Sequence, residues 1–227
     1  MKKLIPTLCV SFFIILITTV LSYSFLKNRT QKAKYETEAS LYNIDEKDYN
    51  LIQYKDFNQL KNYIFNSKEE FEILYFGFPD CPYCNGYTPI INNITKSVSK
   101  PVLYYNITEK IDAETKTNDI IFDSDGTAHN TKEYEEILNF VNLLCNDAVD
   151  KEYIKEKKVE NNGKETSLMR LYVPRYFIIK DNKIIDCFMP SSVDGINLND
   201  YEENSAERKE KEKYIADKFK EFIGRYL

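Results

Sequence analysis

The sequence is poor in histidine: His129 is the one histidine among 227 residues. A metal centre built from imidazole needs several ligands close together. No companion ligand stands near His129 in the sequence. This scarcity argues against a histidine metal site, and we predict that His129 lies in a surface loop.

Positive charge is also scarce over most of the chain. The sequence holds 31 Lys and Arg against 36 Asp and Glu, and the first 34 residues contain six of the basic residues and none of the acidic ones. Residues 35–227 are therefore strongly acidic. Nucleic-acid binding depends on a basic surface that neutralises phosphates. We expect no nucleic acid among the partners.

A long apolar run, Leu4–Leu26, follows Lys2 and Lys3. It exceeds the ~20 residues that a helix needs to cross a bilayer. A cleaved signal peptide is the alternative, because Ser22 and Ser24 are small residues at the spacing of a cleavage site, although no Ala-x-Ala triplet is present. We favour a retained signal-anchor over residues 1–26, because the run is long for a signal peptide.

The polar residues 27–49 then predict a tether. Folding is expected to begin near residue 50, with a strand at Leu51–Tyr54 and a helix opened by Asp56 and Gln59. Phe57, Leu60 and Ile64 share one face of that helix.

Cysteine occurs five times, and two of these residues stand in the motif Cys81-Pro82-Tyr83-Cys84. An apolar strand-like run, Phe71–Phe78, precedes the motif, and apolar residues at helical spacing follow it. The motif therefore lies where a strand gives way to a helix, with Cys81 at the helix start.

A helix start favours a thiolate, because its backbone N–H groups are unpaired and its macrodipole is positive there. Pro82 suits the first helical position, since it has no N–H to satisfy. Cys84 would lie beside Cys81 and be less exposed. We therefore predict that Cys81 attacks a disulfide and that Cys84 resolves the mixed disulfide.

The next strand is predicted at Pro101–Ile107, and residues 108–170 are the least readable part of the chain. Asp123–Gly126 is interpreted as a turn and not a calcium loop, because the glutamate of a calcium loop is missing at its spacing. Asn130 with Glu133 predicts the start of a helix that buries Cys145. Lys151–Lys164 is charge-rich and predicts a helix end followed by a loop.

The C-terminal part reads as a hairpin and a helix. Val173–Lys180 predicts a strand begun by a proline, Asp181–Lys183 a tight turn, and Ile184–Met189 the partner strand, with Cys187 buried in it. From about Glu203 an amphipathic helix is expected. Its apolar face comprises Ile215, Phe219, Phe222, Ile223 and Tyr226.

This order of elements resembles the thioredoxin-like superfamily: an α/β fold with a central mixed sheet flanked by helices. The resemblance is carried by Cys81 and Cys84, by Pro89 in the following helix, and by Val173-Pro174 before the hairpin. It covers residues 50–106 and 170–227, within a predicted domain of 50–227. The segment Phe-Gly-Phe-Pro-Asp-Cys-Pro-Tyr-Cys is most similar to membrane-linked bacteriocin transport accessory proteins of Gram-positive bacteria.

The resemblance implies roles for several residues. Pro174 would be cis and stand against the Cys81–Cys84 disulfide, and Val173 would offer backbone hydrogen bonds to a bound peptide. Pro82 and Tyr83 would shape the site.

The sequence also departs from the family pattern. Tyr75 stands where thioredoxin has a buried aspartate, so the usual proton acceptor for Cys84 is missing. Asp80 replaces a tryptophan. A helical insertion is expected at about 108–170.

These features predict a membrane-anchored thiol-disulfide oxidoreductase whose domain faces outside the cytoplasm, or one secreted after signal cleavage. Its expected partners are protein thiols and disulfides, an extracytoplasmic or membrane electron-transfer partner, and the membrane itself through the N-terminal helix. We expect no metal and no cofactor besides the redox-active disulfide. A thiolate metal carrier and a non-catalytic peptide-binding adaptor are the alternatives.

Overall fold

The computed structural model describes residues 39–107, 120–145, 153–190 and 195–227. The chain divides into two compact units, residues 1–47 and residues 48–227. The predicted membrane segment, Leu4–Leu26, and most of the predicted tether lie outside the described residues. Within the described ranges no helix is both long and apolar enough to span a membrane.

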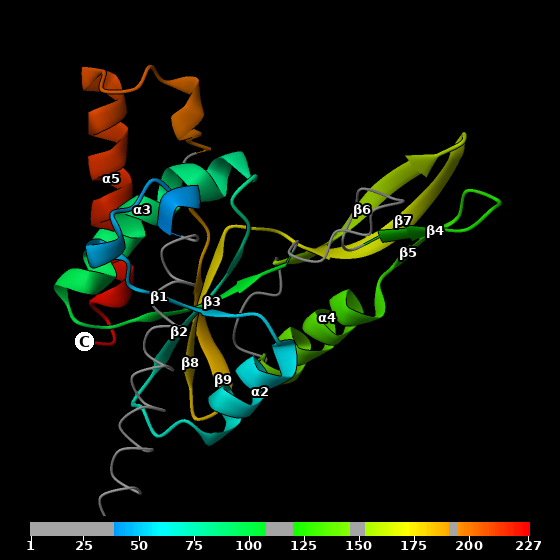
Figure 1. The fold of residues 1–227 in the computed structure, drawn as a ribbon, viewed down its shortest axis with the longest axis horizontal. Coiled ribbons are helices and arrows are strands. Elements are labelled where there is room, and N and C mark those ends of the chain that lie inside the picture. Colours follow the sequence, from blue (N-terminus) through cyan, green and yellow to red (C-terminus); the bar gives the residue numbers. More distant parts are fainter. Residues whose placement is uncertain (1–38, 108–119, 146–152, 191–194) are drawn as a thin grey trace, which may run out of the picture. The chain divides into compact units, whose positions relative to one another are not determined.

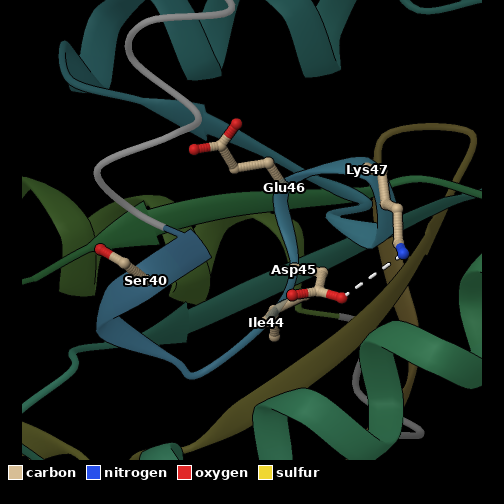
Figure 2. Close-up of a pocket in the computed structure, with 5 residues that line it drawn as sticks. All are labelled: Ser40, Ile44, Asp45, Glu46 and Lys47. Carbon is tan, nitrogen blue, oxygen red and sulfur yellow. Dashed lines mark ion pairs between the residues drawn. The ribbon is translucent and has the colours of Figure 1, made fainter.

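The described part of the first unit is short. Figure 2 shows its small surface depression, which is lined by Ser40 and by residues 44–47. Asp45 and Lys47 form an ion pair of 3.6 Å there, and both side chains are mostly exposed. An exposed pair of this kind contributes little to stability. The 3-10 helix η1 (Glu46–Asp48) follows.

The second unit is built on a mixed five-stranded sheet (Figure 1). Its strand order is β1-β3-β2-β8-β9, in which β1, β3 and β2 are parallel, and β8 is antiparallel to both β2 and β9. The strands are β1 (Leu51–Tyr54), β2 (Glu72–Gly77), β3 (Val102–Asn106), β8 (Arg175–Lys180) and β9 (Lys183–Phe188). β2 is buried along its whole length, as expected of a central strand covered on both faces.

Helices cover both faces of this sheet. On one face, α2 (Phe57–Asn66) and α4 (Lys132–Leu144) share a hydrophobic cluster with alternate residues of the central strands, including Leu74 and Phe177. On the other face lie α3 (Pro82–Ser97) and α5 (Ala206–Ile223), which contact each other. The protein is therefore a mixed α/β structure whose sheet is flanked by helices.

Several elements predicted from local signals are confirmed. Asp56 caps α2, with its side chain accepting from the N–H groups of Asn58 and Gln59. Asp181 and Asn182 have φ values of 51° and 58° and form the two-residue turn between β8 and β9. The face of α5 that was predicted to pack is buried at Ile215, Phe219, Phe222 and Ile223.

The prediction of a helix end and loop at Lys151–Lys164 is wrong within the described residues. Here β6 (Ile154–Asn161) pairs antiparallel with β7 (Lys164–Leu171) through a two-residue turn at Asn162 and Gly163. Most side chains of both strands are exposed, so no buried face marks the period of two.

The preceding segment forms a smaller hairpin. β4 (Ile120–Phe122) and β5 (Ala128–Asn130) flank the predicted turn at Asp123–Gly126. His129 is exposed as predicted, but it lies in β5 and not in a loop. Asn130 is not the cap of α4, because Thr131 accepts the N–H of Tyr134 and caps the helix.

The insertion at about 108–170 stays a prediction, but the described part of this segment is not all helical. α4 belongs to the core of the sheet domain, since Ile137, Leu138 and Val141 are buried against the sheet strands. The described remainder of this segment is two small β-ribbons and contains no second helix.

Candidate active site

Cys81 occupies the N-cap of α3, directly after the turn that follows β2. Its backbone is extended, with φ −77° and ψ 119°, and its N–H donates to the carbonyl of Phe78 at 3.1 Å. Its sulfur accepts the N–H of Cys84 at 3.3 Å. Pro82 holds the first helical position, where no N–H is needed. The Cys81 sulfur thus caps the helix by accepting a backbone N–H, as a Ser or Asp side-chain oxygen does at other helix starts.

The two thiols differ in burial in the predicted sense. Cys81 is 6% exposed and Cys84 is fully buried, and both are free thiols in the structure. Hydrogen bonding from the Cys84 side chain, helped by the N–H groups of Cys84 and Tyr83, outweighs burial and lowers the pKa of Cys81 to about 7. Burial, followed by the contact with Cys81, raises the pKa of Cys84 well above its ordinary value. At neutral pH Cys84 therefore keeps its proton, while Cys81 is divided between thiol and thiolate.

Behind Cys84 lies a buried group of hydroxyls. The hydroxyl oxygens of Tyr75 and Thr88 are 3.0 Å apart, and Thr88 donates to the carbonyl oxygen of Cys84 at 2.6 Å. The Tyr176 hydroxyl lies 3.4 Å from that of Thr88, and hydrogen bonding from Tyr75 partly opposes the rise that burial causes in the pKa of Cys84. The sequence reasoning treated Tyr75 as an absent acid and missed this arrangement, because nothing local in the sequence brings these four residues together.

A second unpredicted contact comes from the segment before α5. In the 3-10 helix η3 (Leu198–Asp200), Asn199 donates its side-chain N–H to the carbonyl of Pro82 at 2.8 Å. Leu198 packs on the next turn of α3, where a Cβ on Gly86 would come within 3.3 Å of it. η3 therefore packs against the motif helix and covers part of its first turns.

The structure places Pro174 at the same edge of the sheet as the motif. Arg175, the first residue of β8, pairs with Phe76 near the end of β2, so both chain segments meet where α3 begins. The Val173-Pro174 peptide is cis, as the resemblance predicted, with Pro174 buried and Val173 half-buried. The peptide-binding role of Val173 stays a prediction, as do the shaping roles of exposed Pro82 and half-buried Tyr83.

The other described cysteines lie on the opposite face of the sheet from α3. Cys145 and Cys187 are both partly buried and pack against the cluster under α2 and α4. Arg175 donates to the Cys187 sulfur at 3.2 Å, while burial raises the pKa of Cys187. Neither cysteine joins the Cys81–Cys84 pair.

His129 pairs with Asp123 at 2.8 Å on the exposed ribbon. Among the residues that the structure describes, no three metal-ligating side chains cluster. In the comparisons with known proteins, neither the protein-family models nor the curated proteins gave a match to this chain.

Proposed function

We propose that this protein is a thiol-disulfide oxidoreductase that exchanges disulfides with protein substrates through Cys81 and Cys84. The observation that carries the proposal is the division of roles between the two thiols. Cys81 is at the helix start with its pKa lowered to about 7, and Cys84 is fully buried beside it with its pKa raised. Such an asymmetric pair is what a nucleophile and a resolving thiol require.

The reaction runs in two displacements. The Cys81 thiolate attacks one sulfur of a substrate disulfide, so that a mixed disulfide forms and the other substrate sulfur leaves as a thiolate. Cys84 then loses its proton and attacks the Cys81 sulfur. The Cys81–Cys84 bond forms, the second substrate sulfur leaves, and both substrate thiolates take up protons from solvent. The substrate gains two electrons and the protein loses two; the reverse sequence oxidises a substrate dithiol.

The element order supports a thioredoxin-like fold for this reaction. A strand, the Cys81 helix, a parallel strand, a helix, a hairpin introduced by Val173-Pro174 and a closing helix follow one another in the second unit. We further propose, from the apolar run Leu4–Leu26 alone, that this domain is anchored to the membrane and faces outside the cytoplasm.

The decisive experiment equilibrates the full chain with defined thiol/disulfide buffers and counts the alkylated cysteines at each ratio. A reversible two-electron transition confined to Cys81 and Cys84 is the expected result, at a potential between about −270 and −120 mV. The matched control is Cys145→Ser/Cys187→Ser, which should titrate as the wild type does. Absence of a Cys81–Cys84 disulfide at every ratio would contradict the proposal.

A further inference from the structure

Neighbouring residues fix the position of the Tyr75 side chain and its hydroxyl. The ring is sandwiched between two cross-strand partners in register: Tyr104 of β3 at 5.0 Å and Tyr176 of β8 at 4.4 Å between ring centroids. The hydroxyl lies over Gly77, where a Cβ would be only 2.1 Å from the oxygen. Any residue other than glycine at position 77 would displace the hydroxyl. Since Tyr75 is fully buried, its hydroxyl must find partners inside the protein.

The direction of each hydrogen bond follows from counting hydrogens. Thr88 has one hydroxyl hydrogen, and it goes to the Cys84 carbonyl, which can only accept. The Thr88 oxygen is left to accept, from the hydroxyl of Tyr75 at 3.0 Å or of Tyr176 at 3.4 Å. The S–H of Cys84 is directed to the Cys81 sulfur, whose pKa it lowers, so toward Tyr75 the Cys84 sulfur acts as an acceptor. While Cys84 is a neutral thiol, the hydroxyl hydrogens of Tyr75 and Thr88 and the S–H of Cys84 each have an acceptor.

Loss of the Cys84 proton changes the best acceptor for the Tyr75 hydrogen, because a thiolate attracts it more strongly than the Thr88 oxygen does. A hydroxyl can either accept or donate, so rotation about the C–O bond of Tyr75 turns its hydrogen from Thr88 to the new thiolate. Thr88 retains a donor nearby, because the Tyr176 hydroxyl is 3.4 Å from its oxygen. The buried sulfur thus gains a charge-assisted hydrogen bond without movement of any ring.

We propose that Tyr75 is the residue that stabilises the Cys84 thiolate while this sulfur closes the Cys81–Cys84 disulfide, an inference that rests on the exchange reaction proposed above. In the closing step the Cys84 electron pair forms the new S–S bond. The pair of the broken bond leaves with the substrate sulfur, and the Cys84 proton passes through solvent to that leaving sulfur. Tyr75 binds no proton permanently; it contributes a hydrogen bond to a reacting atom.

The test separates the two displacements on the full chain. One equivalent of 5,5′-dithiobis(2-nitrobenzoate) releases one coloured thiolate when Cys81 attacks and a second when Cys84 closes the disulfide. Tyr75→Phe keeps the ring and removes the hydroxyl, so it should leave the first release unchanged. It should slow the second about tenfold to hundredfold and move its pH midpoint upward, because charge-assisted hydrogen bonds have this strength.

Matched controls isolate the hydroxyl. Tyr104→Phe removes a hydroxyl from the same stack of rings, and it should close at the wild-type rate. Thr88→Val removes the oxygen that competes with Cys84 for the Tyr75 hydrogen, so its closure should be at least as fast as in the wild type. Thr88→Val also keeps the inference testable if Tyr75→Phe does not fold. The reaction of the remaining cysteines is subtracted with Cys81→Ser/Cys84→Ser.

The outcomes of the two proposals are distinguishable. A wild type that releases only one thiolate would overturn the exchange reaction itself. A wild type that releases two, together with Tyr75→Phe closing at the wild-type rate and pH midpoint, would leave the exchange reaction intact and overturn the role of Tyr75. Slowed closure in Thr88→Val would equally overturn it.

Discussion

The reduction potential of the Cys81–Cys84 couple should change its pH dependence near pH 7. Below about pH 7 the reduced protein carries a proton on both sulfurs, because the pKa of Cys81 is about 7 and that of Cys84 is raised well above 9. Above about pH 7 only Cys84 keeps its proton. Reduction therefore takes up two protons on the acid side of this point and one on the alkaline side.

Each proton taken up with two electrons changes the potential by about 30 mV per pH unit, since a tenfold change in the equilibrium constant corresponds to 29.6 mV for this couple. The potential should fall by about 59 mV per unit below pH 7 and by about 30 mV per unit above it. At pH 9 it should lie about 60 mV above the line extrapolated from the acid side.

The assay equilibrates the protein with thiol/disulfide buffers at several pH values between 6 and 9 and counts the alkylated forms of Cys81 and Cys84 by mass. The same two-proton slope over the whole range would refute the reasoning, because it would mean that Cys81 is not a thiolate anywhere in that range. The sign follows from linkage. A folded-state pKa below the ordinary value of 9 stabilises the reduced fold at alkaline pH, and this stabilisation is lost as the pH falls through 7.

Three substitutions test the surroundings of the site. Cys84→Ala should raise the pKa of Cys81 by about one unit or more, because it removes the hydrogen bond that lowers this pKa most. The pH profile of iodoacetamide alkylation measures the pKa, and an unchanged midpoint would contradict the prediction. Gly77→Ala should destabilise the fold by about 1–3 kcal/mol in urea unfolding, since its Cβ overlaps the Tyr75 hydroxyl, and wild-type stability would show that the strand adjusts freely. Asn199→Ala should speed alkylation of Cys81 about twofold to tenfold, because it removes the hydrogen bond between η3 and the carbonyl of Pro82, and it should cost about 1 kcal/mol of stability. Equal alkylation rates in the variant and the wild type would mean that η3 does not limit access to Cys81.

Elements with strong local signals could be predicted from the sequence. Cys81 at the helix start, the Asp56 cap and the Asp181–Asn182 turn are set by residues within a few positions of one another, and the structure has them as expected. The α5 face follows from its period, because one side of that helix is buried.

The β6–β7 ribbon shows a local signal that was outweighed. Asn162-Gly163 is a strong two-residue hairpin signal, but the flanking Lys and Glu residues disfavour strands and supply no apolar alternation. The ribbon is held by its own backbone pairing and by cross-strand contacts such as Lys158–Glu165 at 2.7 Å. These are pairings and not a buried face, so the hydrophobic pattern did not indicate them.

The start of α4 shows a competition between two neighbouring caps. Asn130 and Thr131 both suit the N-cap, and tertiary contacts decide between them. The Asn130 side chain is already used, since it accepts from Arg170 at 2.8 Å and donates to the carbonyl of Met169 at 3.3 Å. Thr131 is left to cap the helix.

The polar contacts of the candidate site are of the same tertiary kind. Asn199 reaches Pro82 across 117 positions of the sequence, and Tyr176 reaches Thr88 across 88. Composition and periodicity describe neighbours along the chain, so neither indicates such a meeting. From the resemblance alone, Tyr75 reads as a missing acid, whereas the structure shows its hydroxyl beside Gly77 and 3.0 Å from the Thr88 hydroxyl.

Access to Cys81 bears on which disulfides can react. Exchange requires the attacked sulfur to approach Cys81 in line with the bond that breaks, yet only 6% of Cys81 is exposed. η3 holds the carbonyl of Pro82 on one side, while the exposed Pro82 ring and half-buried Tyr83 border the motif. A disulfide in the interior of a folded protein cannot reach a sulfur so recessed. We therefore expect disulfides in exposed, extended segments to be the better substrates of the exchange reaction proposed above, and reaction with a folded protein should increase when the segment that carries its disulfide is unfolded.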